Sequence, residues 1–170
     1  MSEPCVLVAY ASKNGGTAEM AQWIGETLSG EGLDVEVRPA PAVEDLRPYT
    51  AVVLGSGVYA GRWLREAVRF ARHHRKALLR IPVWLFSSGP LDVSAAEREI
   101  PAVPGVLKIA DGLDAREHVT FGGRLVEGAR GFIARLILSK GKGGDFRDRD
   151  RVRAWALGIA KEAAAQPRPD

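Results

Sequence analysis

The residues best suited to chemistry lie near the start of the chain, in the segment 12–17 with the sequence Ser-Lys-Asn-Gly-Gly-Thr. The backbone N–H groups of such a segment can turn inward around an anion, and its hydroxyl and amide side chains add polar groups. An apolar run precedes the segment at 5–11, and a helical pattern follows it at 16–29. A strand, a loop and a helix N-terminus in this order predict a phosphate site. The candidate residues are Ser12, Lys13, Asn14, Gly15, Gly16 and Thr17.

The spacing of these glycines excludes two nucleotide-binding motifs. A dinucleotide fingerprint needs Gly-x-Gly-x-x-Gly, and a triphosphate loop needs Gly-x-x-x-x-Gly-Lys followed by Ser or Thr. Segment 12–17 contains neither pattern. An ordinary glycine turn that caps a helix remains the alternative for this segment taken alone.

Two further loops of small and polar residues follow later apolar runs. Small residues let the backbone approach a flat ring, while Tyr59 or Trp63 could stack on it and Ser87 or Ser88 could donate hydrogen bonds. Strand ends converge in a parallel sheet, so a phosphate site and a ring site would share one cleft, as in flavin mononucleotide (FMN) binding. The candidate residues are Gly57, Val58, Tyr59, Ala60, Gly61 and Trp63 in one loop and Ser87, Ser88, Gly89, Pro90 and Asp92 in the other.

The elements that position these loops follow from the alternation of apolar runs with amphipathic segments. That alternation predicts an α/β fold in which helices connect the strands of a parallel sheet. We expect five strands and three helices. The strands are predicted at 5–11, 33–39, 51–56, 81–87 and 117–122, and the helices at 16–29, 62–80 and 148–165.

Length and composition are those of a soluble globular protein with a substantial core. The chain has 170 residues, of which 46% are hydrophobic and 26% charged, so we expect a single domain over 1–170. No apolar stretch approaches the roughly 18 residues of a spanning helix, and no basic secretion signal begins the chain. The expected location is therefore cytoplasmic.

Cysteine and histidine provide no candidate metal centre. Cys5 is the one cysteine, so an internal disulfide and a multi-cysteine site are both excluded. His73 and His74 lie in a basic helical segment, and His118 stands apart from them in the sequence. We therefore predict no metal.

Positive charge is concentrated in two segments although the net charge is only +3. The segment 62–80 holds seven lysines and arginines and one acidic residue, Glu66, and further basic residues lie between 130 and 153. A solvated helix face is the simplest explanation, and a surface for anionic lipid or an acidic substrate is the other. No nucleic-acid motif accompanies the charge, so we expect no nucleic-acid partner.

The chain resembles the flavodoxin family, whose hydroxyl- and glycine-rich first loop is matched by 12–17. This resemblance implies a three-layer sandwich with a five-stranded parallel sheet in the order 2-1-3-4-5 and helices on both faces. It also implies FMN as the cofactor, with phosphate at 12–17, one flavin face at 58–63 and the other at 87–92. The basic isoelectric point of about 9.2 differs from the acidic character typical of carrier flavodoxins.

A closer resemblance is to the menaquinone-dependent protoporphyrinogen IX dehydrogenase branch of that family. It rests on a basic segment, here at about 124–147, inserted before the last helix. It implies an FMN enzyme of heme biosynthesis that passes electrons from a reduced substrate, protoporphyrinogen IX, to a quinone. Arg62 and Arg124 would contact substrate carboxylates, or else be ordinary solvated arginines. Apolar residues at helical spacing in 130–142 would touch the inner face of the cell membrane, or else pack on the sheet edge.

Two other functions remain open. A flavodoxin-like electron-transfer protein would carry electrons between protein partners and use its basic surface to bind an acidic one. A deazaflavin-binding protein would use the same phosphate loop for another ring. The oligomeric state cannot be read from the sequence.

Overall fold

Three nearly continuous apolar runs form the central strands of a parallel sheet. They are β1 (Cys5–Ala11), β3 (Ala51–Tyr59) and β5 (Val83–Ser88). A computed structural model describes residues 5–13, 15–59, 62–89, 104–121, 124–125, 144–145 and 149–165. Strands buried on both faces need apolar side chains on both, which explains why these runs do not alternate with polar residues.

The edge strands are β2 (Asp34–Pro39) beside β1 and β6 (Glu117–Phe121) beside β5. The order is β2-β1-β3-β5-β6, with all neighbours parallel. Counting only these five strands, this is the expected order 2-1-3-4-5. The sixth strand, the two-residue β4 (Arg62–Trp63), pairs antiparallel with the end of β3.

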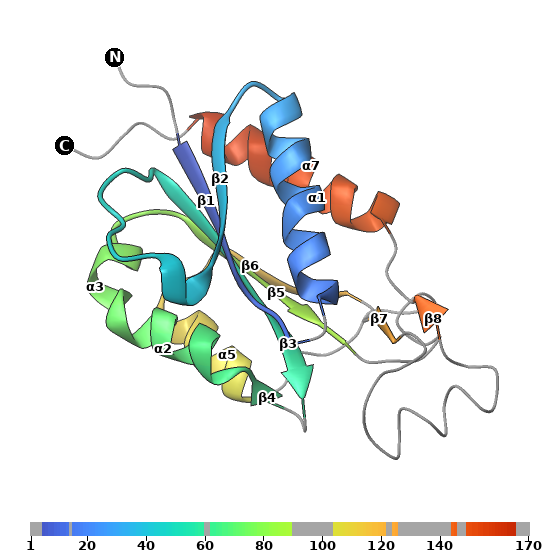
Figure 1. Ribbon diagram of the computed structural model, residues 1–170. Helices are drawn as coiled ribbons and strands as arrows, with labels where there is room; N and C mark the ends of the chain where they lie inside the picture. Colours follow the sequence, from blue (N-terminus) through green and yellow to red (C-terminus); the bar gives the residue numbers. More distant parts are fainter. Residues whose placement is uncertain are drawn as a thin grey trace.

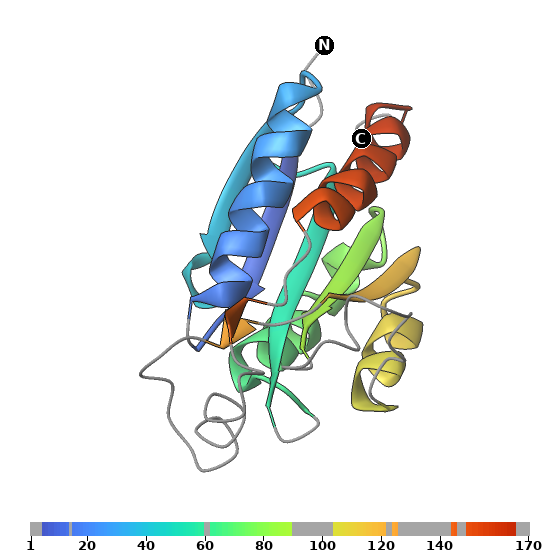
Figure 2. The same cartoon turned by 90° about the vertical axis from the view of Figure 1, so that its right-hand side faces the viewer.

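Helices cover both faces of the sheet and complete three layers (Figures 1 and 2). One face carries α1 (Gly16–Gly30) and α7 (Arg149–Ala165), which pack on Val6 and Val8 of β1. The other carries α2 (Arg65–His73), α3 (Arg75–Leu78) and α5 (Pro104–Gly112), which pack with Leu7 and Ala9. Successive residues of a strand face opposite layers, so each strand contributes to two cores. The expected fold class is confirmed.

The helix predicted at 62–80 is wrong in its boundaries. Arg62 and Trp63 return along β3 as β4, and the remaining residues divide into α2 and α3 at His74. Helix α5 was not predicted, although Val106, Ile109 and Ala110 show helical spacing after Pro104. Two short strands, β7 (Arg124–Leu125) and β8 (Gly144–Asp145), pair with each other at the end of the molecule where α1 begins (Figures 1 and 2).

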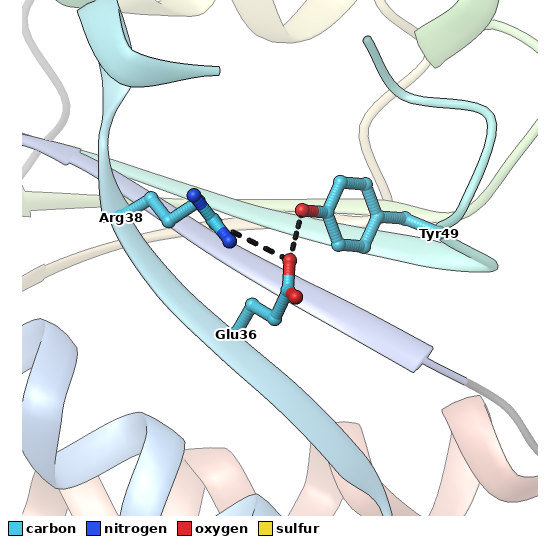
Figure 3. Close-up of polar contacts among 3 residues, drawn as sticks. All are labelled: Glu36, Arg38 and Tyr49. Carbon is cyan, nitrogen blue, oxygen red and sulfur yellow. Dashed lines mark hydrogen bonds and ion pairs between the residues drawn. The ribbon is translucent and has the colours of Figure 1, made fainter. Parts of the chain in front are cut away.

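A polar cluster fixes the chain between β2 and β3, beyond the short helix η1 (Ala40–Ala42). Figure 3 shows the Tyr49 hydroxyl and the Arg38 guanidinium both directed at the Glu36 carboxylate. Burial, and then the hydrogen bond to Glu36, raise the pKa of Tyr49 to about 12. The hydrogen bond from Tyr49, followed by that from Arg38, lowers the pKa of Glu36. The cluster therefore holds a neutral phenol against a carboxylate and anchors the edge strand.

Candidate functional site

The first loop is a tight turn that connects the end of β1 to the start of α1. Gly15 has φ of 85°, a left-handed conformation that glycine adopts without strain. Its N–H donates a hydrogen bond of 3.1 Å to Ser12 Oγ, and its carbonyl accepts from Glu19 N–H at 3.0 Å. The hydrogen bond from Glu19 N–H to the Gly15 carbonyl is the first of helix α1. The N-terminus of α1 therefore lies directly at the loop.

The groups around this turn are ones that can bind a phosphate. No heavy atom outside the adjoining residues comes within 4 Å of the position that a Gly15 side chain would occupy, so the turn is open there. The helix N-terminus supplies a positive partial charge, Lys13 lies beside the turn, and Thr17 lies in the first helical turn. An anion would therefore meet donors and positive charge at one place.

The strand register brings the candidate loops together at one edge of the sheet. Ala11, the last residue of β1, lies opposite Ser56, and Gly57 lies opposite Ser88. Strand β3 continues beyond the end of β1 to Tyr59 and projects past the first loop (Figure 1). The expected convergence of the three loops is therefore seen in the backbone.

The chain after β3 returns along it as β4. Val58 pairs with Trp63 and Tyr59 pairs with Arg62. Leu64 N–H donates to Ser56 Oγ at 3.0 Å, which fixes the return of the chain into α2. The hairpin thus sets where β3 ends and where α2 begins.

A buried polar chain connects this hairpin to the next two strands. Trp63 Nε1–H donates to Ser87 Oγ at 2.7 Å, and Ser87 Oγ lies 2.7 Å from His118 Nε2. Trp63 is 6% exposed and Ser87 is 1% exposed. Burial lowers the pKa of His118 to about 4, so the ring is neutral near pH 7. In the tautomer with Nδ1 protonated, the neutral ring accepts the Ser87 proton at Nε2, while Ser87 Oγ accepts from Trp63.

This finding corrects the expected roles of Trp63 and Ser87. Trp63 packs in the core on the α2 and α5 side, so its ring is not open for stacking in a strand-end cleft. Ser87 is buried, and its hydroxyl contacts Trp63 and His118 within the protein, so it is not presented to a ligand. The physical reason is that successive strand residues face opposite layers, and Trp63 and Ser87 face the layer of α2 and α5.

The end of β5 is tied to the end of β6. Gly89 N–H donates to the Phe121 carbonyl at 2.8 Å. Gly89 has φ of 149°, and a side chain on it would begin 3.5 Å from Val58 Cβ. That distance is an ordinary contact, so the second and third loops lie side by side at Gly89, and it is the φ of 149° that favours glycine there.

Thr120 adds a buried polar group beside this end. It lies opposite Ser87 in the register and is 7% exposed. Its hydroxyl has no hydrogen-bond partner among the described residues. Neither Thr120 nor His118 was recognised from sequence as part of the site, because their proximity to Ser87 depends on the register between β5 and β6, which no local pattern records.

Several candidates are placed only in part. Arg62 is exposed and lines a groove between α2 and α5, and the backbone of Arg124 lies in β7. Nothing is described of the side chains of Tyr59 and Arg124. Outside the described residues lie Asn14, Ala60, Gly61, Pro90, Asp92 and most of the basic segment 124–147.

Among the described residues, no three histidine, cysteine or acidic side chains gather as metal ligands would. The helices in the same part of the chain are too short or too polar to cross a bilayer.

The family model described as "Flavodoxin domain" matches residues 7–145, most of the chain. The chain belongs to the flavodoxin family. FMN is the cofactor of this family, so the expectation of FMN is confirmed, and the first loop has the donors and positive charge that its phosphate needs. At this level the protein is an FMN-binding electron-transfer protein. No curated protein matches the chain.

Solved structures support the same fold. A short-chain flavodoxin associated with a non-canonical PDU bacterial microcompartment aligns with a TM-score of 0.66 and 17% identity, covering 94% of this chain and 99% of that one. A flavodoxin from Pseudomonas aeruginosa, solved as a cysteine-to-serine mutant, has a TM-score of 0.62 and 16% identity, with 95% of this chain and 99% of that one covered.

Rubredoxin oxygen:oxidoreductase from Desulfovibrio gigas aligns with a TM-score of 0.63 and 15% identity over 96% of this chain. This chain spans 37% of the length of that one. A larger oxidoreductase therefore includes a region of this fold.

Proposed function

We propose that the protein is an FMN-dependent oxidoreductase that passes electrons from a reduced substrate to a quinone. The observation that carries the proposal is the left-handed turn at Gly15, which joins β1 to the N-terminus of a long helix in a chain of the flavodoxin family. When bound, FMN supplies the redox chemistry.

The residues of the chain hold and orient the cofactor in this proposal. Ser12 fixes the first turn, and the N-terminus of α1 meets the phosphate. The β3–β4 hairpin and the end of β5 border the ring through their backbones near Gly57, Val58 and Gly89. The Trp63–Ser87–His118 chain keeps the hairpin in place against β5.

Protoporphyrinogen IX is the substrate that we propose, and a menaquinone is the acceptor. The support is the resemblance of the basic segment 124–147 to that branch of the family, together with the basic isoelectric point. Arg62 and Arg124 would bind substrate carboxylates. The segment 130–142 would bring a cytoplasmic protein to the membrane surface, where each basic residue contributes about 1 kcal/mol.

An electron carrier without its own substrate is the second candidate. The exposed side chains Arg65, Arg69, Arg72 and Lys76 favour it, because they present positive charge on α2 and α3 that an acidic redox partner would match. The first loop and its cofactor would be the same in both functions.

Anaerobic turnover separates the two candidates. Purified protein loaded with FMN is mixed with excess protoporphyrinogen IX and a soluble menaquinone analogue, and porphyrin fluorescence is followed. The oxidoreductase predicts many equivalents of porphyrin per FMN, above the rate with free FMN at the same concentration. A single equivalent, followed by no further product, would contradict the enzyme and support the carrier.

A further inference from the structure

A groove of about 740 Å³ lies between α2 and α5, on the face of the sheet opposite α1 and α7. Its volume is within the range of about 300–1,000 Å³ that small-molecule sites occupy. Apolar residues from both helices form its floor, among them Val68, Val106 and Ile109, and the buried ring of Trp63 contributes from β4. Neither the phosphate turn nor β5 lines this groove.

The rim of the groove carries positive charge from both sides. Arg62, Arg72 and Arg75 line it from β4, α2 and α3, and Lys108 lines it from α5. All four side chains are exposed, and no acidic residue lines the groove. In the described part of the chain, these four side chains form no ion pair.

One of the four cations also fixes the shape of the groove. Arg75 Nε–H donates to the Gly112 carbonyl at 3.2 Å, which links α3 to the end of α5. Because α3 directly follows α2, this contact helps to hold α2 and α5 on either side of the groove. Its acceptor is a neutral carbonyl, so it does not neutralise the charge of Arg75. Arg62, Arg72 and Lys108 complete the cationic rim.

Two other grooves on the molecule have a different charge balance. The groove between α1 and α7 contains Glu26 and Glu31, and Arg149 lies 3.5 Å from the Glu26 carboxylate. The groove beside η1 contains Glu66 with Arg65 and Arg69. A further hollow along α2 is also lined by cations, Arg65, Arg69 and Arg72, but Val68 is its one apolar lining residue. Among the described grooves, the one between α2 and α5 therefore stands out by combining an apolar floor from two helices with a rim of cations alone.

We infer that the groove between α2 and α5 binds a small amphipathic anion, a molecule with a flat apolar body and two or more acid groups. The apolar body would cover the floor, and the acid groups would meet guanidinium and ammonium groups at the rim, where guanidinium binds carboxylate through two hydrogen bonds. Charge complementarity selects this ligand class over a neutral one. The groove shares Arg62 with the proposed substrate contacts, but ligand binding here is measured without FMN and without electron transfer, so the inference can fail while the redox proposal holds.

The test measures binding of bis-anilinonaphthalene sulfonate (bis-ANS), a fluorescent molecule with apolar rings and two sulfonates. Arg72→Glu/Lys108→Glu reverses two rim charges, while Arg69→Glu/Arg80→Glu reverses two exposed charges outside this groove. Each replacement changes the charge by two, so both variants change the net charge from +3 to −1. We expect the dissociation constant to rise about tenfold in the rim variant at low salt and much less in the control. Equal losses in the two variants would overturn the inference.

A second pair of variants tests the floor. Ile109→Glu places a carboxylate on the floor, while Leu107→Glu changes an exposed residue of the same helix that does not line the groove. Binding should be lost in the first and kept in the second, with both proteins folded by circular dichroism. If Ile109→Glu does not fold, the comparison of rim variants decides. Unchanged binding in folded Ile109→Glu would contradict the inference, and so would displacement of bis-ANS by acidic peptides but not by small aromatic dicarboxylates.

Discussion

At the residue scale, the polar groups near the strand ends serve mainly to hold the backbone in place. Ser87 accepts a hydrogen bond from Trp63 and lies within bonding distance of His118, and these three residues come from β5, β4 and β6. Because the pKa of His118 is lowered to about 4, its neutral ring can accept the hydroxyl proton of Ser87. The hairpin beside the proposed flavin site therefore depends on an uncharged histidine.

Because burial lowers the pKa of His118, the free energy of unfolding should depend on pH. The unfolded chain, with a histidine pKa near 6.5, binds a proton between about pH 6.5 and 4 that the folded chain excludes. Stability from His118 is therefore fully present above pH 6.5 and lost as the pH falls toward 4. The loss is on the order of 1–2 kcal/mol, below the full shift because the ring keeps some solvent contact.

Chemical denaturation of wild type and His118→Gln across pH 4–7 measures this contribution. The glutamine amide can still accept from Ser87 but does not titrate, so the variant's free energy of unfolding should fall less steeply with acid. His74, whose pKa burial also lowers, is present in both proteins and cancels in the comparison. Parallel curves for the two proteins would contradict the role given to His118.

At the element scale, the absence of a side chain at Gly55 in β3 leaves room for the ring of Phe86 in β5. A Cβ on Gly55 would overlap the ring of Phe86, which lies directly opposite it in the register. Phe86 in turn lies 6.3 Å from Phe121 and 6.1 Å from Trp155, measured between ring centroids. The glycine thus makes room for an aromatic cluster between the sheet and α7.

Gly55→Ala should therefore destabilise the protein by about 1–3 kcal/mol, the cost of overpacking. Gly158→Ala is the matched control, since Gly158 lies in α7 with open space at the Cβ position. It should raise stability by about 0.5–1 kcal/mol through helix propensity. Thermal unfolding of both variants checks the pair, and a stable Gly55→Ala protein would show that the Phe86 ring moves away freely.

The boundaries of single strands and helices show which elements a sequence pattern predicts well. Strand Cys5–Ala11 is correct to the residue, because a continuous apolar run between polar segments defines it. Strand β3 runs three residues past its predicted end at 56, because backbone pairing with β4 extends it where no apolar run continues. The segment 62–80 has helical periodicity overall, yet pairing of Arg62 and Trp63 with β3 overrides it.

At the scale of the whole molecule, the sheet order places the three loop-bearing strands side by side. The order could be expected once the first loop suggested the family, and the match to the flavodoxin domain over 7–145 supports it. The polar chain through Trp63, Ser87 and His118 could not be expected, because it depends on three strands meeting in a particular register. The charged groove between α2 and α5 could not be predicted from the sequence either, since α5 itself was not predicted.

The most direct test of the phosphate site is a fluorescence titration of the purified protein with FMN and with riboflavin, which lacks the phosphate. Two variants of equal charge and equal backbone strain sharpen it. Gly15 and Gly32 have φ of 85° and 90°, with open space at both Cβ positions, and flank opposite ends of α1. Gly15→Asp puts a carboxylate at the phosphate turn, and Gly32→Asp puts one at the far end.

We predict stoichiometric binding of FMN, about tenfold or more tighter than riboflavin, because the turn and the N-terminus of α1 hold the phosphate. Gly15→Asp should remove this preference, and Gly32→Asp should retain it. Equal affinity of the wild-type protein for FMN and riboflavin, or an unchanged preference in Gly15→Asp, would contradict a phosphate site at this turn.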